Sequence, residues 1–366
     1  MKINKSSILY ILIKKIVNKI RILFPRNLNN SFDKMHRRLS SLVYENESLQ
    51  EQINDLRGNI QEDQDSPPFP FFSNASFNNI NKFSTINLND FDLGLQVGRA
   101  DPRKLFDSNL CRVEDVLNEE FIDISVNKLK HPPCTNRKLW EWVYIYYMLA
   151  RYQKLNSFSS GLGFGVGSER LASAFTAAGA KILATDAPVS AVIGQGWETK
   201  NQHATSLQQL HYSELVDYSI FSKNCKFDAL DMNDYASIPT GYDFHWSSCV
   251  IEHLGGISQG LDFLIHSSKK LNAGGIAVHT TEFNLSSGIE TADNSGTCIF
   301  RKLDFNNLAQ EANQHGLQLE PMIYDPGSHF LDYFVDSPPY SDVHLRLILE
   351  RYVSTSIGIV IRKKAN

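Results

Sequence analysis

The spacing of hydrophobic and polar residues changes several times along the chain. Within residues 1–30, apolar side chains recur at helical intervals with lysines and arginines opposite them, which predicts a basic amphipathic helix. Residues 31–62 follow a seven-residue repeat in which eight of nine seam positions are apolar, and this pattern predicts a coiled coil. The polar exception, Asn46, favours a parallel two-stranded register, so we expect a homo-oligomer. The other interpretation is a single amphipathic helix folded back on its own domain.

Beyond the repeat, the pattern divides the chain into three further segments. Residues 63–92 are rich in Asp, Ser, Pro and Asn, which is typical of a linker. Residues 93–155 are mostly helical in pattern and are expected to form a lead-in that caps the next domain. Residues 156–366 alternate short apolar runs with helical or loop segments. This alternation predicts an α/β fold with a doubly wound, mostly parallel seven-stranded sheet that binds ligands at the carboxyl ends of its strands.

Composition limits the compartment and the partners. The net charge of -4 gives no general reason to expect nucleic-acid binding, although residues 1–38 hold ten basic residues and one acidic residue. The five cysteines are widely spaced without a CxxC pair, which fits a reduced cytoplasmic compartment. No apolar run reaches the ~20 residues that cross a bilayer. The basic helix keeps two interpretations, peripheral contact with the inner face of a membrane or packing against protein.

A strand predicted at residues 157–160 leads into the glycine-rich stretch SSGLGFGVG, residues 159–167. Such a turn lets backbone N–H groups and a following helix approach a nucleotide-type cofactor closely. The dinucleotide fingerprint requires glycine or alanine five positions after its first glycine, but Val166 and Ser168 stand at those positions. The glycine spacing therefore argues against a dinucleotide and for another nucleotide cofactor.

The spacing x-x-Gly-x-Gly-x-Gly at residues 159–165 resembles motif I of the class I S-adenosylmethionine-dependent methyltransferases. Asp186 closes the next strand, where this family places the carboxylate that binds the ribose hydroxyls. Asp231 and Met232 resemble the end of the third strand, where the family contacts adenine. Residues 242–254 and 271–275 resemble the fourth-strand motif and the turn before the fifth strand. The resemblance implies a Rossmann-like methyltransferase fold and S-adenosyl-L-methionine as the cofactor.

The resemblance also implies cofactor contacts at the carboxyl ends of the first four strands. These are Ser159, Gly161, Gly163, Gly165, Asp186, Asp231, Met232 and Ser247. One position departs from the family, because Ser159 stands where an acid that holds the methionine portion is usual. Glu141, on the preceding helical segment, is an alternative source of that carboxylate.

Methyl transfer requires an aligned acceptor, and a hydroxyl acceptor also requires a base. The catalytic candidates follow the fourth and fifth strands, and they are Glu252, His253, His279 and Glu282. His253 is the preferred base because imidazole titrates near neutral pH, and its other interpretation is a side chain that binds a loop or caps a helix. Strand periodicity places His279 and Glu282 on opposite faces. No spacing of His and Cys predicts a metal site.

The sequence thus predicts an oligomeric S-adenosylmethionine-dependent O-methyltransferase that acts on a glycan or another small hydroxylated molecule. A methyltransferase core with a basic helix and a coiled coil resembles enzymes that modify bacterial surface glycans near the inner membrane. Two alternatives stay open. A nicotinamide-dependent oxidoreductase would share the glycine loop and Asp186 but gives no account of Asp231. A non-catalytic coiled-coil assembly protein with a degenerate cofactor fold would explain Ser159.

Overall fold

The computed structural model describes residues 72–73, 104–188, 203–338, 340 and 343–365. The predicted amphipathic helix, the predicted coiled coil and most of the predicted linker lie outside these described residues. Apart from residues 132–134, the described part belongs to one folding unit, composed of Phe69–His131 and Thr135–Asn366. Every helix in the described part is too short or too polar to span a membrane.

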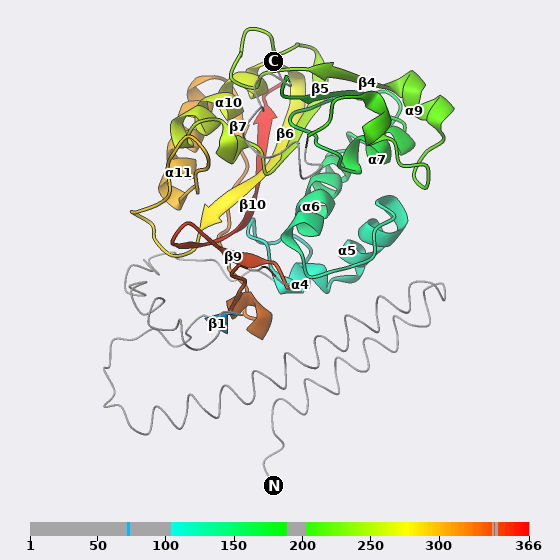
Figure 1. Ribbon diagram of the computed structural model, residues 1–366. Helices are drawn as coiled ribbons and strands as arrows, with labels where there is room; N and C mark the ends of the chain where they lie inside the picture. Colours follow the sequence, from blue (N-terminus) through cyan, green and yellow to red (C-terminus); the bar gives the residue numbers. More distant parts are fainter. Residues whose placement is uncertain (1–71, 74–103, 189–202, 339, 341–342, 366) are drawn as a thin grey trace, which may run out of the picture. The chain divides into compact units, whose positions relative to one another are not determined.

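A mixed sheet forms the centre of this unit (Figure 1). Its strands follow the order β4-β3-β2-β5-β6-β10-β7. Their bounds are β2 Ser160–Gly163, β3 Lys181–Asp186, β4 Cys225–Ala229, β5 Tyr242–Ser248, β6 Leu271–Asn284, β7 Leu317–Leu319 and β10 Tyr352–Lys363. The first five strands of this order are parallel, whereas β10 is antiparallel to both β6 and β7. The predicted mostly parallel sheet is confirmed, with β9 (Arg346–Leu349) as an additional strand on β10.

Two strands are much longer than the strand at the centre of the sheet. β6 has 14 residues and β10 has 12, whereas β2 has four. β6 and β10 stay paired up to Asn284 and Ser354, well past the end of β2, and β6 projects beyond the other parallel strands in Figure 1. A small second sheet joins β1 (Phe72–Ser73) in parallel to β8 (Phe334–Val335).

Helices cover both faces of the central sheet. α6 (Arg137–Arg151), α7 (Leu171–Ala177) and α9 (Tyr218–Asn224) lie on one face, and α10 (Ile257–Lys269) and α11 (Lys302–Gln314) lie on the other (Figure 1). The remaining helices are short, and they are α4 Val113–Val116, α5 Glu119–Asp123, the π-helix η3 Ile124–Lys128 and the 3-10 helices η5 Leu207–Leu210, η6 Ile251–His253 and η7 Phe330–Tyr333. Layers of helix on both faces define a doubly wound α/β fold.

The position of α6 follows from its cap and its aromatic face. The side-chain oxygen of Asn136 accepts a hydrogen bond from the Lys138 backbone N–H at 2.9 Å and so caps the first turn. Trp140 and Tyr144, one turn apart, are fully buried and stack with ring centroids 5.0 Å apart. Tyr144 packs against Gly358 of β10. These contacts hold α6 against β5, β6 and β10.

Gly358→Ala is expected to lower the free energy of unfolding by about 2–3 kcal/mol. A Cβ at this position would lie 2.1 Å from the Tyr144 ring, so the buried ring would have to move. Urea unfolding followed by circular dichroism measures the change. Gly288→Ala is the matched control, because no atom of the described residues lies within 4 Å of a Cβ there. Equal losses in both variants would contradict the packing explanation.

Candidate active site

The glycine loop leaves the carboxyl end of β2 between two neighbouring strands. Phe164 N–H donates to the Trp246 carbonyl of β5 at 2.9 Å, and Val166 N–H donates to the Thr185 carbonyl of β3 at 3.1 Å. Gly165 and Gly167 have φ values of 54° and 51°, in the region that favours glycine. The loop therefore lies where the sheet order reverses direction, which is the usual ligand site of an open α/β sheet.

The structure corrects the predicted register of the glycines. Ser159 precedes β2 at the amino end of the strand, and Gly161 lies inside β2. A Cβ on Gly161 would lie 2.2 Å from the Phe244 ring, so no side chain fits there. The loop glycines are Gly163, Gly165 and Gly167. The predicted strand at 157–160 was three residues early, because glycines carry no side chain by which a hydrophobic pattern could mark β2.

Asp186 ends β3 and holds the glycine loop in place. One carboxylate oxygen accepts from Gly167 N–H at 3.0 Å and Ala204 N–H at 2.9 Å, and the other accepts from Ala187 N–H at 2.8 Å. His203 lies 3.9 Å from this carboxylate. Burial raises the pKa of Asp186, and the three backbone donors act in the opposite direction. The carboxylate is thus buried, anchored and next to the loop.

Asp231 and Met232 follow β4, next to the end of β3. Leu230 N–H donates to the Asp186 carbonyl at 2.8 Å, which brings the ends of the two strands together. The Asp231 side chain is exposed and accepts from Asn233 N–H at 2.9 Å, whereas Met232 is buried in the core. The structure therefore brings Asp186, Asp231 and the glycine loop to one edge of the sheet, as the sequence predicted.

Ser247 and His279 are buried neighbours on the adjacent strands β5 and β6. The Ser247 hydroxyl pairs with His279 Nδ1 at 2.7 Å, and both residues are fully buried. Burial lowers the pKa of His279 to about 3. The imidazole packs near Phe263 of α10, whereas Glu282 of the same strand meets Arg137 of α6. The prediction of opposite faces agrees with the structure. The catalytic role predicted for His279 and the cofactor role predicted for Ser247 stay predictions, now for two fully buried residues.

His253 and Glu252 are adjacent in η6 but have different surroundings. His253 Nδ1 pairs with the Gly296 carbonyl at 2.9 Å, on the loop that follows β6. Glu252 is buried and accepts a hydrogen bond from the Thr281 hydroxyl at 2.9 Å. The predicted base His253 is therefore held by a loop, while Glu252 belongs to the group of charges next to it.

We call this group the charged cluster, and it comprises Arg137, Lys138, Glu141, Glu169, Cys249, Glu252 and Glu282. Glu141 of α6 is its most buried member. The Glu141 carboxylate accepts from the hydroxyls of Ser248 at 3.1 Å and Ser356 at 2.6 Å. Burial alone would raise the pKa of Glu141, but Lys138 and Arg137 lower it to about 2. Glu141 is thus a buried carboxylate that stays ionised.

Arg137 joins α6 to the long strands of the sheet. Its Nη1 lies 2.5 Å from Glu282 and 3.3 Å from Glu141. The Ser354 hydroxyl of β10 donates to the other oxygen of Glu282 at 2.5 Å. Burial and the nearby Glu252 raise the pKa of Glu282 even though Arg137 opposes this. Glu282 therefore accepts a proton more readily than an ordinary glutamate does.

Lys138 joins the charged cluster to the glycine loop. Its Nζ lies 2.9 Å from Glu141 and 3.4 Å from Glu169, which stands two residues after Gly167. The Lys138 side chain is 38% exposed and Glu169 is 15% exposed, so both reach the surface of the site. The loop and the cluster are therefore one continuous site at the carboxyl edge of the sheet.

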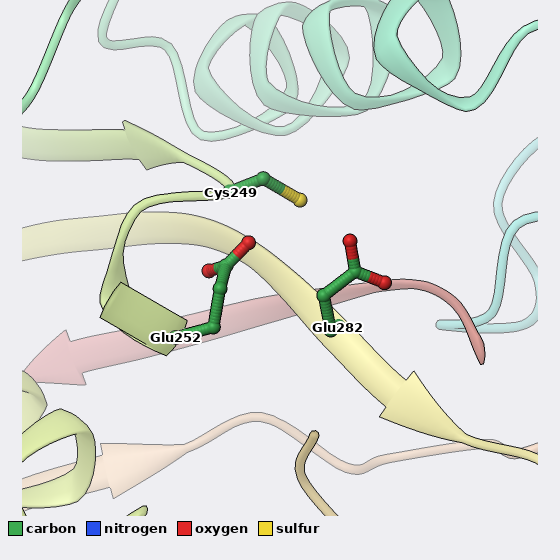
Figure 2. A group of neighbouring side chains, drawn as sticks. All are labelled: Cys249, Glu252 and Glu282. Carbon is green, nitrogen blue, oxygen red and sulfur yellow. The ribbon is translucent and has the colours of Figure 1, made fainter. Parts of the chain in front are cut away.

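Cys249, Glu252 and Glu282 converge in Figure 2, with ligand atoms within 4.8 Å of one another. Each of them already has a partner. The Cys249 thiol donates to Glu141 at 3.0 Å, Glu252 accepts from Thr281, and Glu282 pairs with Arg137. Burial, Glu141 and Glu252 also raise the pKa of Cys249 well above its usual value, whereas a metal ligand must be a thiolate. The arrangement fits a hydrogen-bonded charge network better than a metal centre.

Sequence reasoning missed Arg137, Lys138 and Glu169 and gave Glu141 only a minor part. A signal was present, because three charged residues at positions 137, 138 and 141 stand in a helix whose other positions are mostly apolar. Charges on such a helix are usually solvated, so their burial against β5, β6 and β10 became visible only in the fold.

In the order of strands in the central sheet, β10 lies antiparallel between β6 and β7. Solved structures that match this chain include many S-adenosylmethionine-dependent methyltransferases. Magnesium protoporphyrin IX methyltransferase from Synechocystis is 12% identical, with a TM-score of 0.37 and a match covering 60% of this chain and 82% of that chain. TehB from Haemophilus influenzae is 13% identical, with a TM-score of 0.37 and a match covering 67% of each chain. No protein-family model and no curated protein sequence matches this chain.

Proposed function

We propose that this chain transfers a methyl group from S-adenosyl-L-methionine to a hydroxyl group. The observation that carries the proposal is the glycine loop, which is fixed by Asp186 at 3.0 Å and connected through Lys138 to a buried charged cluster. Gly165 and Gly167 of the loop have positive φ values, and Asp186 ends β3 while Asp231 follows the adjacent strand β4. These are the residues that would hold the ribose and the adenine.

The site chemistry disfavours a nicotinamide dinucleotide. In dinucleotide-binding folds the pyrophosphate lies at the start of the helix that follows the glycine loop. Here Glu169 stands just before α7, and Glu169 and Glu141 together outweigh the charge of Lys138, so this group has no surplus positive charge for a pyrophosphate. Arg170 does not compensate, because it already pairs with Glu214 at 2.6 Å. A cofactor with a positively charged sulfur is more compatible with the Glu169 carboxylate than a pyrophosphate is.

When bound, the cofactor supplies an electrophilic methyl group on a sulfonium. A hydroxyl acceptor of that methyl group would have to give its proton to the protein. Glu282, with its raised pKa and its position at the end of β6, is placed to accept this proton. Arg137 holds the Glu282 carboxylate in position. Glu252 and His253 are the other candidates near the same edge.

The proposal extends to the acceptor and the partners. A glycan or another small hydroxylated molecule fits a site whose carboxylates accept hydrogen bonds. The basic and heptad patterns of residues 1–62 support a cytoplasmic homo-oligomer with peripheral membrane contact, and the charge balance gives no support to a nucleic-acid acceptor. The non-catalytic alternative rested on Ser159, and that residue lies away from the loop.

Isothermal titration calorimetry of the full-length chain tests the cofactor. We expect binding of S-adenosylmethionine and its product S-adenosylhomocysteine, and no binding of NAD, because NAD would bring its pyrophosphate against Glu169. Incubation with labelled S-adenosylmethionine and a panel of sugars and phenols, followed by mass spectrometry, then identifies the methylated atom. Binding of NAD without S-adenosylhomocysteine would overturn the proposal.

A further inference from the structure

β2, which leads into the glycine loop, carries no charged side chain. Positions 161 and 163 are glycines, and a Cβ at either of them would lie within 2.3 Å of the Phe244 or Trp246 ring. Asp186 is already occupied by three backbone N–H groups. Charges that recognise a ligand beyond its nucleoside must therefore come from other elements.

Helix α6 supplies such charges beside the loop. Lys138 Nζ lies 3.4 Å from Glu169 and 3.4 Å from the Ser248 carbonyl at the end of β5. Lys138 thus spans the distance from α6 to the segment that follows the glycine loop. Burial alone would lower the pKa of Lys138, but Glu141 and Glu169 raise it, so the ammonium stays charged.

Glu169 is the second carboxylate next to Lys138, which lies between Glu141 and Glu169. Burial raises the pKa of Glu169, while Lys138 favours its ionised form. A second cation near this carboxylate would relieve the cost of its burial. Lys138 and Glu169 therefore present one positive and one negative group side by side at the loop.

That pair of charges is complementary to an α-amino acid, which carries a carboxylate and an ammonium on one carbon. We propose that Lys138 binds the carboxylate and Glu169 the ammonium of the amino-acid end of the adenosyl cofactor, with Glu141 as the residue that positions Lys138. The inference rests on the proposed function and names residues of α6 and of the loop that follows β2. Glu141 is fully buried and bonded to Lys138 at 2.9 Å, so it acts through Lys138.

The test compares ligands that share the adenosyl part. S-adenosylhomocysteine carries the whole amino-acid end, and 5′-methylthioadenosine carries none of it. Lys138→Met and Glu169→Gln are each expected to weaken S-adenosylhomocysteine binding by about 10- to 100-fold, the range of a lost charge-assisted hydrogen bond. Binding of 5′-methylthioadenosine should change less than about twofold. Decarboxylated S-adenosylmethionine should be insensitive to Lys138→Met and sensitive to Glu169→Gln.

Lys181→Met is the matched control, because Lys181 is exposed at the amino end of β3 and should leave every affinity unchanged. Thermal unfolding of each variant separates loss of binding from loss of fold, and Glu169→Gln keeps the test valid if Lys138→Met is unstable. Equal weakening of both ligands, or no weakening of either, overturns the inference. Failure of the unaltered protein to bind either adenosyl ligand overturns the proposed function instead.

Discussion

Asp186→Asn is expected to weaken S-adenosylhomocysteine binding by about 100-fold. An asparagine offers one acceptor oxygen, whereas the native carboxylate accepts from Gly167, Ala187 and Ala204. The amide NH2 group would face a backbone N–H group, so the loop would move away from β3. Loss of charge-assisted hydrogen bonds at about 1.5–3 kcal/mol each accounts for the expected magnitude. Calorimetric titration gives the dissociation constant.

Asp243→Asn is the control for this experiment. Asp243 also accepts a backbone hydrogen bond, from Ser160 N–H at 2.9 Å, but it does so at the amino end of β2. It binds Asn272 as well, at 2.9 Å. This variant should lose some stability and keep the affinity for S-adenosylhomocysteine. If Asp186→Asn binds as tightly as the unaltered protein, Asp186 is not the anchor of a cofactor loop.

Stability is expected to fall steeply in mild acid because of two buried histidines. Burial lowers the pKa of His279 to about 3 and that of His245 well below its usual value. Both ring nitrogens of His245 are without a hydrogen-bond partner among the described residues. Below pH 6.5 the unfolded chain binds protons at these two sites and the native chain does not. The free energy of unfolding should therefore decrease between pH 6.5 and about 3, by roughly 3–5 kcal/mol for His279 alone.

Urea titrations from pH 7.5 to pH 4 measure this slope. His245→Phe removes a buried unpaired imidazole and should flatten the slope, since Phe164 and Tyr242 already form aromatic surroundings for the ring. His315→Gln is the control, because His315 is exposed. An unchanged slope for His245→Phe, or an equal change for His315→Gln, would show that other groups govern the acid response.

The sequence was sufficient to predict a doubly wound, mostly parallel sheet and the approximate position of most of its strands along the chain. Short apolar runs mark β3, β5 and β6 because their side chains are buried between two helix layers. β2 was placed three residues early because Gly161 and Gly163 have no side chains to form a hydrophobic pattern. The space beside them is filled by aromatic rings of β5. The same shift places Ser159, a predicted cofactor residue, before β2 and not after it.

The charged cluster could not be derived from the sequence, since it depends on contacts between distant segments. Glu141 and Ser356 are 215 positions apart, and their hydrogen bond of 2.6 Å exists only because α6 packs on β10. Likewise, Ser247 looked polar and near the site, but it pairs with His279 inside the core. Whether a polar residue of a strand lies on the ligand side depends on which helix layer covers it.

Because β6 and β10 are much longer than β2, the residues of the site come from two different parts of the sheet. Under the proposed function, the nucleoside would lie at the short strands and the glycine loop, whereas Glu282, Ser354 and Ser356 stand on the part of β6 and β10 that extends past β2. Under that function, substitutions in the paired extension of β6 and β10, which we call the arm, could change the methyl acceptor without altering the residues around the cofactor. Variation in this arm would then diversify the substrates of related chains while their cofactor stays the same.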